Sequence, residues 1–299
     1  MDYNTVIIGS GVAGMTAAIY LARANISVCI LEKEIPGGQI TRTSTIDNYP
    51  GFISIEGPEL ANSMYSQVMN LNVSYFYTEA IEIINLPDKK IIKTKEREIN
   101  CQNIIIATGR SPRKLNVTNE EKLTGRGISY CAICDGGLYK GKNVAVIGGG
   151  KSALEETLYL SKICNKVTLI HRRDGFRAEE DMINDVKSQP NIEILTNRIV
   201  EKFIEEDNKL SKVIIKDQNG NLEEIEVDGC FEYIGQIPNT ENFKNLNILD
   251  QNGYIEVNEE YETSIKNIYA IGDCIQKSLY QIITACNDGA VVASKIAKI

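Results

Sequence analysis

The sequence predicts an α/β protein built around two dinucleotide-binding domains. Three observations support this prediction. A glycine-rich turn follows an apolar run near the N-terminus, the same pattern returns after Ile147, and each turn leads into a helical pattern and a second apolar run. Strand, glycine turn, helix and strand in this order form the βαβ unit of nucleotide-binding folds. A chain of 299 residues is long enough for two domains, each with its own core.

The first repeat begins at the N-terminus. Residues 4–9 form a β-branched run that ends in glycine, which predicts a strand. An alanine-rich pattern over residues 15–24 predicts a helix, and residues 27–31 predict the second strand. The first βαβ unit therefore occupies about the first thirty residues.

The second repeat has the same order. Residues 143–147 predict a strand, residues 152–163 a helix and residues 166–170 another strand. Chance repetition would not be expected to reproduce the second strand as well. The pattern therefore favours two related domains.

The remaining segments are predicted to be connections, hairpins and a terminal helix. Proline and polar residues at 111–116 and 236–243 indicate linkers. Residues 81–94 and 210–227 resemble antiparallel hairpins, and residues 281–298 predict the final helix.

Composition excludes some classes of function. The net charge of −8 argues against nucleic acid or an anionic membrane as the main partner, because both require a basic face. No apolar stretch approaches the ~20 residues needed to cross a bilayer, and no basic segment precedes the first apolar run as in a signal peptide. We therefore expect a cytoplasmic protein, in which most of the eight cysteines are free thiols.

The first glycine turn predicts a nucleotide site. Gly9, Gly11 and Gly14 form GxGxxG directly after a strand, an arrangement that brings backbone N–H groups to a pyrophosphate at the helix N-terminus. A glycine-rich turn without a ligand would share this motif. Glu32 at the end of the second strand favours the ligand, because its carboxylate can accept hydrogen bonds from a ribose diol. The site suits a nucleotide without a 2′-phosphate.

The second glycine turn predicts a different nucleotide. Its fingerprint, GxGxxA, begins at Gly148, and the matching strand ends in basic residues instead of an acid. Arg172, Arg173 and Arg177 with His171 could hold a 2′-phosphate through charge-assisted hydrogen bonds. A solvated basic face is the alternative, but three arginines at this strand end favour NADP over NAD.

Cys131 and Cys134 form a CxxC pair close to the second fingerprint. Zinc would need further Cys or His ligands, and haem attachment would need His where the chain has Asp135. A buried inert pair remains possible, although Asp135 could move a proton and the glycines after it favour an accessible turn. Redox use is the best interpretation. A flavin would connect a hydride donor to a disulfide, so we expect FAD in the first site.

The whole chain resembles the low-molecular-weight, bacterial-type thioredoxin reductases. The matching motifs are GSGVAG, GGQI, DNYPG, ATGR, SYCAICDG, GGGKSALEE, HRRDGFRAEE, YIGQIPNT and IYAIGDC. The resemblance implies an α/β fold of two Rossmann-like nucleotide-binding domains, in which the FAD domain is discontinuous and interrupted by the NADPH domain. The FAD domain would span 1–113 and 241–299, and the NADPH domain with the CxxC pair would span 114–240.

The resemblance also assigns site residues. The residues expected to contact FAD are Gly9, Gly11, Gly14, Glu32, Gly38, Gln39, Asn48, Gly272, Asp273 and Gln281. The residues expected to line the NADPH site are Gly148, Gly150, Ser152, Ala153, His171, Arg172, Arg173 and Arg177. In the family, Cys134 would face the flavin, Cys131 would attack the disulfide of thioredoxin, and Asp135 would act as acid and base. No metal site is predicted, whereas a homodimer and a rotation between the domains are implied.

Three positions depart from the family pattern. Tyr280 precedes Gln281 where arginine is frequent, Leu138 stands where the family often has an aromatic residue, and Lys151 replaces a common Asn or Asp. These departures leave open a related flavin-dithiol reductase that uses ferredoxin as donor or another redoxin as acceptor. A non-catalytic redox or nucleotide sensor is a further alternative, which the complete set of flavin motifs disfavours.

Overall fold

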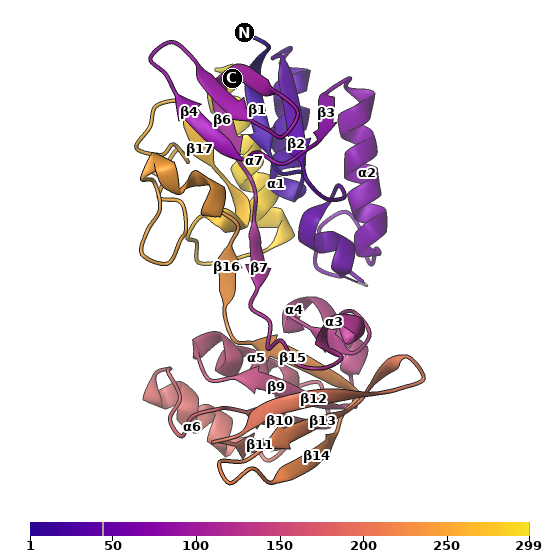
Figure 1. The fold of residues 1–299 in the computed structure, drawn as a ribbon. Helices are drawn as coiled ribbons and strands as arrows, with labels where there is room; N and C mark the ends of the chain where they lie inside the picture. The colour runs from indigo at the N-terminus through magenta and orange to yellow at the C-terminus, as the bar shows by residue number, and fades with distance from the viewer. Residues whose placement is uncertain (44, 299) are drawn as a thin grey trace. The chain divides into compact units, whose positions relative to one another are not determined.

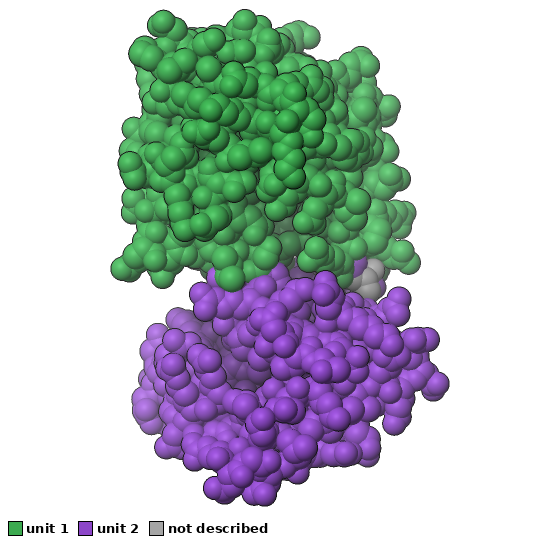
Figure 2. Space-filling model, viewed as in Figure 1, with its two compact units in different colours: residues 1–42, 49–111, 237–299 green, residues 43–48, 112–236 purple. Residues whose placement is uncertain are grey.

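The computed structural model describes residues 1–43 and 45–298. The chain divides into two compact units, shown in Figure 2. The first unit contains Met1–Arg42, Tyr49–Ser111 and Ile237–Ile299, and the second contains Thr43–Asn48 and Pro112–Gln236. The first unit is therefore discontinuous and is interrupted by the second, which confirms the predicted fold class.

The first unit contains a mostly parallel sheet with the strand order β3-β2-β1-β6-β5-β4, and β17 also pairs with β6 (Figure 1). Its strands are β1 Tyr3–Ile8, β2 Val28–Glu32, β3 Ser74–Tyr77, β4 Glu82–Asn85, β5 Lys90–Lys93, β6 Glu98–Ile106 and β17 Ile268–Ala270. β3, β2, β1, β6 and β17 pair in parallel with one another, whereas β5 pairs antiparallel with both β4 and β6. The apolar β-branched run of β1 is buried from Thr5 to Ile8, as expected for a central strand.

Helices cover this sheet. They are α1 Val12–Arg23, α2 Gly57–Asn70, α7 Ile282–Ala297 and the short 3₁₀ segments η1 Gly38–Arg42, η3 Glu241–Leu246 and η4 Gly272–Cys274. Figure 1 shows α7, at the end of the chain, beside α1. The two backbones approach closely, because a Cβ built on Gly289 would lie 2.4 Å from the carbonyl oxygen of Ala13. A glycine in α7 thus allows the C-terminal helix to pack on the first nucleotide-binding helix.

The second unit contains a parallel sheet with the strand order β11-β10-β9-β15-β8 and a separate antiparallel sheet, β12-β13-β14. The strands are β8 Ile128–Ser129, β9 Asn143–Gly148, β10 Lys166–Ile170, β11 Ile192–Leu195, β12 Ile199–Glu206, β13 Lys209–Lys216, β14 Leu222–Glu226 and β15 Gly229–Tyr233. The helices are α3 Glu120–Leu123, α4 Ala132–Asp135, α5 Lys151–Ser161, α6 Glu180–Ser188 and the 3₁₀ segment η2 Gly136–Tyr139. The predicted repeats, both hairpins and the terminal helix are confirmed, with bounds shifted by a few residues.

The two predicted linkers are more ordered than expected. Each contains a short strand, β7 Arg110–Pro112 and β16 Gln236–Pro238, and the two strands pair with one another. The sequence did not predict this pairing, because these segments are polar and contain proline, and a short two-stranded ladder has no apolar periodicity of its own. Among the described residues, no helix is long and apolar enough to cross a membrane.

The sheet topology decides where functional residues meet. The carboxyl ends of β1, β2, β6 and β17 lie at one edge of the first sheet, and those of β8, β9, β10 and β15 lie at one edge of the second. Open α/β sheets bind ligands outside this edge. Both edges carry the residues that the sequence singled out.

Candidate cofactor sites and redox centre

The first glycine turn connects β1 to α1. A Cβ on Gly14 would lie 2.1 Å from the carbonyl oxygen of Gly9, and one on Gly9 would lie 2.4 Å from that of Ala107. Side chains are therefore excluded where the turn packs against α1 and against the end of β6. At Gly11, the residue before α1, nothing lies within 4 Å of a built Cβ. The turn therefore packs tightly against the protein at Gly9 and Gly14, whereas the space beside Gly11 could accept a ligand.

Glu32 at the end of β2 is held by the same turn. Its Oε2 accepts hydrogen bonds from the backbone N–H of Ser10 at 2.7 Å and from the Ser10 hydroxyl at 2.9 Å. Its Oε1 accepts the N–H of Glu34 at 2.9 Å. The hydroxyl of Tyr75 on β3 donates to the Ser10 oxygen at 2.8 Å. Glu32 is thus fixed as an acceptor beside the turn, where a ribose diol would be bound.

The GGQI segment also packs against this turn. The N–H of Gly37 donates to the carbonyl oxygen of Ser10 at 2.9 Å. A Cβ on Gly38 would lie 3.3 Å from the Cα of Gly11. The side chain of Gln39 donates to the carbonyl oxygen of Arg110 at 2.6 Å. These predicted FAD residues therefore gather at one sheet edge, whereas Asn48 is exposed and falls in the second compact unit.

The Gly-Asp motif follows β17. Gly272 has a φ of +73°, a conformation that favours glycine, and its N–H donates to Asp288 Oδ2 at 2.9 Å. Asp288 is 2% exposed and also accepts hydrogen bonds from Lys277 at 2.5 Å and from the Tyr261 hydroxyl at 2.9 Å. This buried network fixes the loop that presents Asp273.

Arg110 is a functional candidate that sequence reasoning did not select. Its Nε lies 3.4 Å from Oδ2 of Asp273, and its guanidinium lies 3.5 Å from the centre of the Tyr280 ring. Gln281 follows Tyr280 and immediately precedes α7. The ATGR motif placed Arg110 in a family pattern, but no local signal indicated that it would meet Asp273 from the other end of the chain.

Buried polar atoms at this edge support a bound nucleotide. Thr108 Oγ1 is shielded from solvent and has no hydrogen-bond partner within the described part of the chain, and Arg110 Nε, equally shielded, has only the long ion pair with Asp273 at 3.4 Å. Burying such groups without a partner costs free energy. Together with the open side of Gly11, these atoms fit the phosphate and ribityl oxygens of a flavin nucleotide.

The second glycine turn connects β9 to α5 in the second unit. A Cβ on Gly148 would lie 2.6 Å from the carbonyl oxygen of Tyr233, and one on Gly149 would lie 2.1 Å from the His171 ring. Nothing lies within 4 Å of a Cβ on Gly150, the residue before α5. Like the first turn, this one packs tightly against the protein at its first glycines and leaves space beside the residue that precedes the helix. The predicted residues Ser152 and Ala153 lie in the first turn of α5.

The basic loop lies against this second turn. The N–H of Arg177 donates to the carbonyl oxygen of Gly149 at 2.7 Å, and Arg172, Arg173 and Arg177 are all exposed. His171 is only 5% exposed and stacks on Phe176. Burial lowers the pKa of His171, so the charge of the loop comes from the three arginines. Such a cluster can hold a phosphate through bidentate hydrogen bonds.

Lys151, one of the three departures, points into a group of acids. Its Nζ lies 3.9 Å from a carboxylate oxygen of Glu155 and 3.6 Å from one of Glu179. Both pairs are exposed, so they contribute little to stability.

The cysteine pair lies at the end of β8. Cys131 and Cys134 form a disulfide, and the N–H of Cys134 donates to Cys131 Sγ at 3.2 Å. Ser129 donates its hydroxyl to Asp135 Oδ2 at 2.6 Å and accepts the N–H of Cys131 at 3.1 Å. Burial raises the pKa of Asp135, and the Ser129 hydrogen bond opposes this shift. Asp135 Oδ1 is buried and has no hydrogen-bond partner in the described structure.

Tyr233 connects the cysteine pair to the second glycine turn. Its hydroxyl accepts the N–H of Ala132 at 2.6 Å, while its backbone carbonyl closes the turn at Gly148. Sequence reasoning missed both Tyr233 and Ser129. Ser129 lies in the SYCAICDG motif and Tyr233 begins the YIGQIPNT motif, but no local pattern indicated that Tyr233 would meet Ala132, 101 residues away in the chain.

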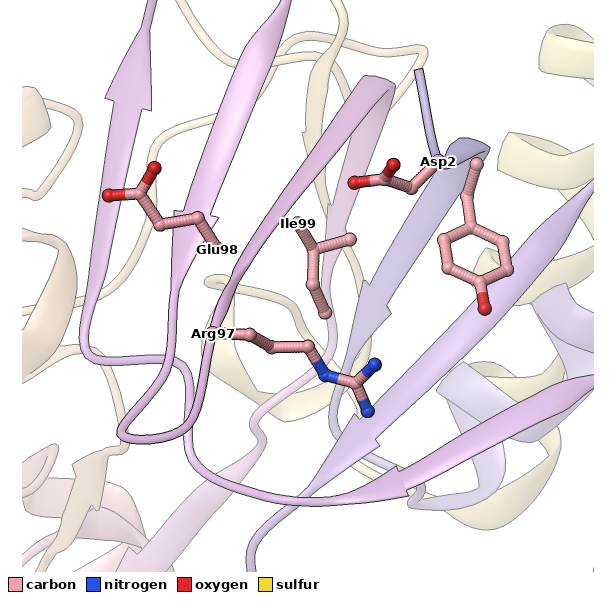
Figure 3. Close-up of a pocket in the computed structure, with 5 residues that line it drawn as sticks. Asp2, Arg97, Glu98 and Ile99 are labelled. Atoms are coloured by element: carbon pink, nitrogen blue, oxygen red, sulfur yellow. The ribbon is translucent and has the colours of Figure 1, made fainter.

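A surface pocket of the first unit lies at the opposite ends of the strands from the first glycine turn. Its volume is about 440 Å³, and Figure 3 shows the side chains around it. The lining residues are Asp2, Tyr3, Arg97, Glu98 and Ile99. They lie at the beginnings of the parallel strands β1 and β6, opposite to the edge at which such sheets bind nucleotides. The pocket contains no predicted site residue.

Comparisons with known proteins agree with this arrangement. The model of the pyridine nucleotide-disulphide oxidoreductase family matches residues 3–289. The thioredoxin reductase of Bacillus subtilis (strain 168) is 42% identical over 295 residues, which cover 98% of this chain and 93% of that protein. The solved thioredoxin reductase of Streptococcus pyogenes MGAS5005 has a TM-score of 0.94 and 41% identity, and the match covers 99% of this chain and 97% of that one. A solved ferredoxin-flavin thioredoxin reductase of Clostridium acetobutylicum has a TM-score of 0.53 and 29% identity, with coverage of 99% and 97%.

Proposed function

Because the chain belongs to the pyridine nucleotide-disulphide oxidoreductase family and, within it, to the thioredoxin reductases, we propose that it carries electrons from NADPH through FAD to the Cys131–Cys134 disulfide and on to thioredoxin. One observation carries this proposal. The disulfide, the second glycine turn and the arginine loop all follow strands of one parallel sheet, at its carboxyl edge.

The first unit would hold FAD through the Gly9–Gly14 turn, Glu32 and the Asp273 loop. FAD, when bound, supplies the step that thiols lack, acceptance of a hydride and release of two electrons to a disulfide. Glu32 would orient the ribose, and backbone N–H groups at the start of α1 would bind the pyrophosphate. The buried atoms Thr108 Oγ1 and Arg110 Nε would gain partners.

The second unit would bind NADPH and perform the thiol chemistry. Reduction of the disulfide takes up two electrons and two protons, so a proton donor is needed beside the sulfurs. Asp135 fits this role, because burial raises its pKa and leaves Oδ1 free. The thiolate of Cys131 would then attack the disulfide of thioredoxin, and Cys134 would resolve the mixed disulfide and restore the starting pair.

The exposed arginines favour NADPH as donor over NADH or ferredoxin. Arg172, Arg173 and Arg177 supply three guanidinium groups beside the second turn, and neither the 2′-hydroxyl of NADH nor ferredoxin would require such a phosphate site. The ferredoxin alternative rests on the departures at Tyr280 and Leu138 and on the similarity to the Clostridium acetobutylicum structure, whose name includes that donor.

The test is anaerobic mixing of the purified protein with NADPH, and separately with NADH, while flavin absorbance is followed. Fast bleaching by NADPH and slow bleaching by NADH are expected. Substitution of Arg172 and Arg173 by Met should raise the KM for NADPH by about 10–100-fold and leave that for NADH nearly unchanged. Lys187→Met, which removes an exposed cation from α6, is the matched control.

Two results would contradict the proposal. A bound flavin that neither nucleotide bleaches would remove NADPH as donor and favour ferredoxin. Full turnover of thioredoxin by Cys134→Ser would exclude the dithiol route, because a single thiol cannot restore the disulfide. We further propose that the protein is cytoplasmic and forms a homodimer. Sedimentation of the purified protein would test the homodimer.

A further inference from the structure

Arg110 occupies a distinct position at the first sheet edge. It follows the long central strand β6, and its neighbours come from three remote segments of the same unit. Its backbone carbonyl accepts the hydrogen bond from Gln39, its Nε faces Asp273, and its guanidinium covers the ring of Tyr280. Two of these three neighbours belong to the predicted FAD site.

The charges around Arg110 are balanced in pairs. Lys277 forms a hydrogen bond with Asp288, and this leaves Arg110 as the nearest partner of Asp273. The side chains of Arg110 and Asp273 are 18% and 22% exposed. Burial raises the pKa of Asp273, and the charges of Arg110 and Lys277 oppose that shift. The guanidinium therefore lies in a mostly dry setting, where its charge is weakly screened.

The hydrogen-bonding capacity of Arg110 exceeds what the protein uses. A guanidinium carries five N–H donors in a rigid fork. Its Nε is buried without a hydrogen-bond partner in the described residues, and the approach to Asp273 at 3.4 Å is longer than a good hydrogen bond. The Tyr280 ring holds the guanidinium plane through a cation–π contact. The fork is thus fixed in place with donors to spare.

We propose that Arg110 is a cofactor-positioning residue that donates hydrogen bonds to acceptor atoms of FAD and strengthens its binding. This proposal rests on the proposed use of FAD. Asp273 and Tyr280 orient the guanidinium from two sides, and the cofactor takes up the donors that the protein leaves unused. Because Arg110 pairs with Asp273, its charge also reduces the repulsion between that carboxylate and the negatively charged cofactor.

The test measures FAD binding rather than turnover. Apoprotein is titrated with FAD, and the dissociation constant is taken from the change in flavin fluorescence. Arg110→Met, which removes the charge and keeps a long side chain, should weaken binding by about 10–100-fold. Arg110→Lys keeps the charge without the fork and should give a smaller loss.

Arg97→Met is the matched control. Arg97 also stacks on an aromatic ring of the first unit, with its guanidinium 3.9 Å from the centre of the Phe76 ring, but it lies at the opposite sheet edge in the pocket of Figure 3. Its substitution should change FAD affinity by less than about twofold. This control separates loss of any stacked arginine from loss of the one beside Asp273.

The outcomes are decisive. If Arg110→Met binds FAD within twofold of the unaltered protein, the proposal is wrong. It is equally wrong if the melting temperature of the apoprotein falls while the affinity of the folded fraction stays the same, since that result indicates a structural role. Should Arg110→Met not fold, Arg110→Gln is titrated instead, with the same expected loss. Failure of the unaltered protein to bind FAD would instead refute the proposed function.

Discussion

Replacing Glu232 by Gln should stabilise the second unit, and by an amount that grows with pH. Glu232 lies on β15, an inner strand of the parallel sheet, and is 2% exposed. Burial, and to a lesser extent the nearby Glu120, raises the pKa of Glu232 from 4.5 to about 9. Glu120 itself accepts hydrogen bonds from the backbone N–H groups of Leu115, Asn116 and Val117. Glu232 therefore keeps its proton in the folded protein at neutral pH.

The magnitude follows from proton linkage. In the unfolded chain Glu232 ionises above pH 4.5, whereas in the folded chain it stays neutral up to about pH 9. Its contribution to stability is therefore complete below pH 4.5 and is lost at about 1.4 kcal/mol per pH unit as the pH rises toward 9. At pH 7 the free energy of unfolding is lowered by about 3 kcal/mol. Gln resembles the protonated acid and cannot ionise, so Glu232→Gln avoids this loss.

Equilibrium urea unfolding followed by circular dichroism at pH 5, 6, 7 and 8 measures the effect. The difference between Glu232→Gln and the unaltered protein should be below about 1 kcal/mol at pH 5 and increase to about 3 kcal/mol at pH 7. The control is Glu223→Gln on the exposed strand β14, whose small effect should not follow this slope. A difference that is flat across the pH range, or a destabilised Glu232→Gln, would refute the reasoning.

Three further predictions concern the sites. Ser129→Ala removes the hydrogen bond that lowers the pKa of Asp135. The alkaline limb of the pH profile for disulfide reduction should therefore move to higher pH. An unmoved profile would exclude Asp135 as the acid. Tyr75→Phe removes the hydroxyl that donates a hydrogen bond to Ser10 beside Glu32. FAD binding should weaken by about 3–10-fold in a titration of the apoprotein. Unchanged affinity would show that the Glu32 carboxylate does not need this hydrogen bond. Gly14→Ala places a Cβ where the backbone leaves 2.1 Å and should lower the free energy of unfolding by about 1–3 kcal/mol; a melting temperature equal to that of the unaltered protein would contradict the close packing.

Much of the fold and part of the site could be predicted from local sequence. The periodic runs that form β1, α1, β9 and α5 identify their elements within a few residues, because side-chain spacing reports directly on strand or helix. The two glycine turns and the CxxC pair are also local, since each depends on residue types at fixed short separations. The position of the arginine loop followed from the same logic, because it comes directly after a predicted strand.

Other features depend on contacts between residues remote in sequence. Arg110 meets Asp273, Tyr233 supports the backbone at Ala132, and Glu232 lies beside Glu120. No spacing rule relates the members of these pairs, since strand order and register alone bring their segments together. Their energetics also arise only on folding, because burial in the tertiary structure creates the shifted pKa values and the unsatisfied donors. The sequence by itself thus determined which nucleotide motifs and which redox pair the protein carries, while the tertiary structure decided which other side chains position them.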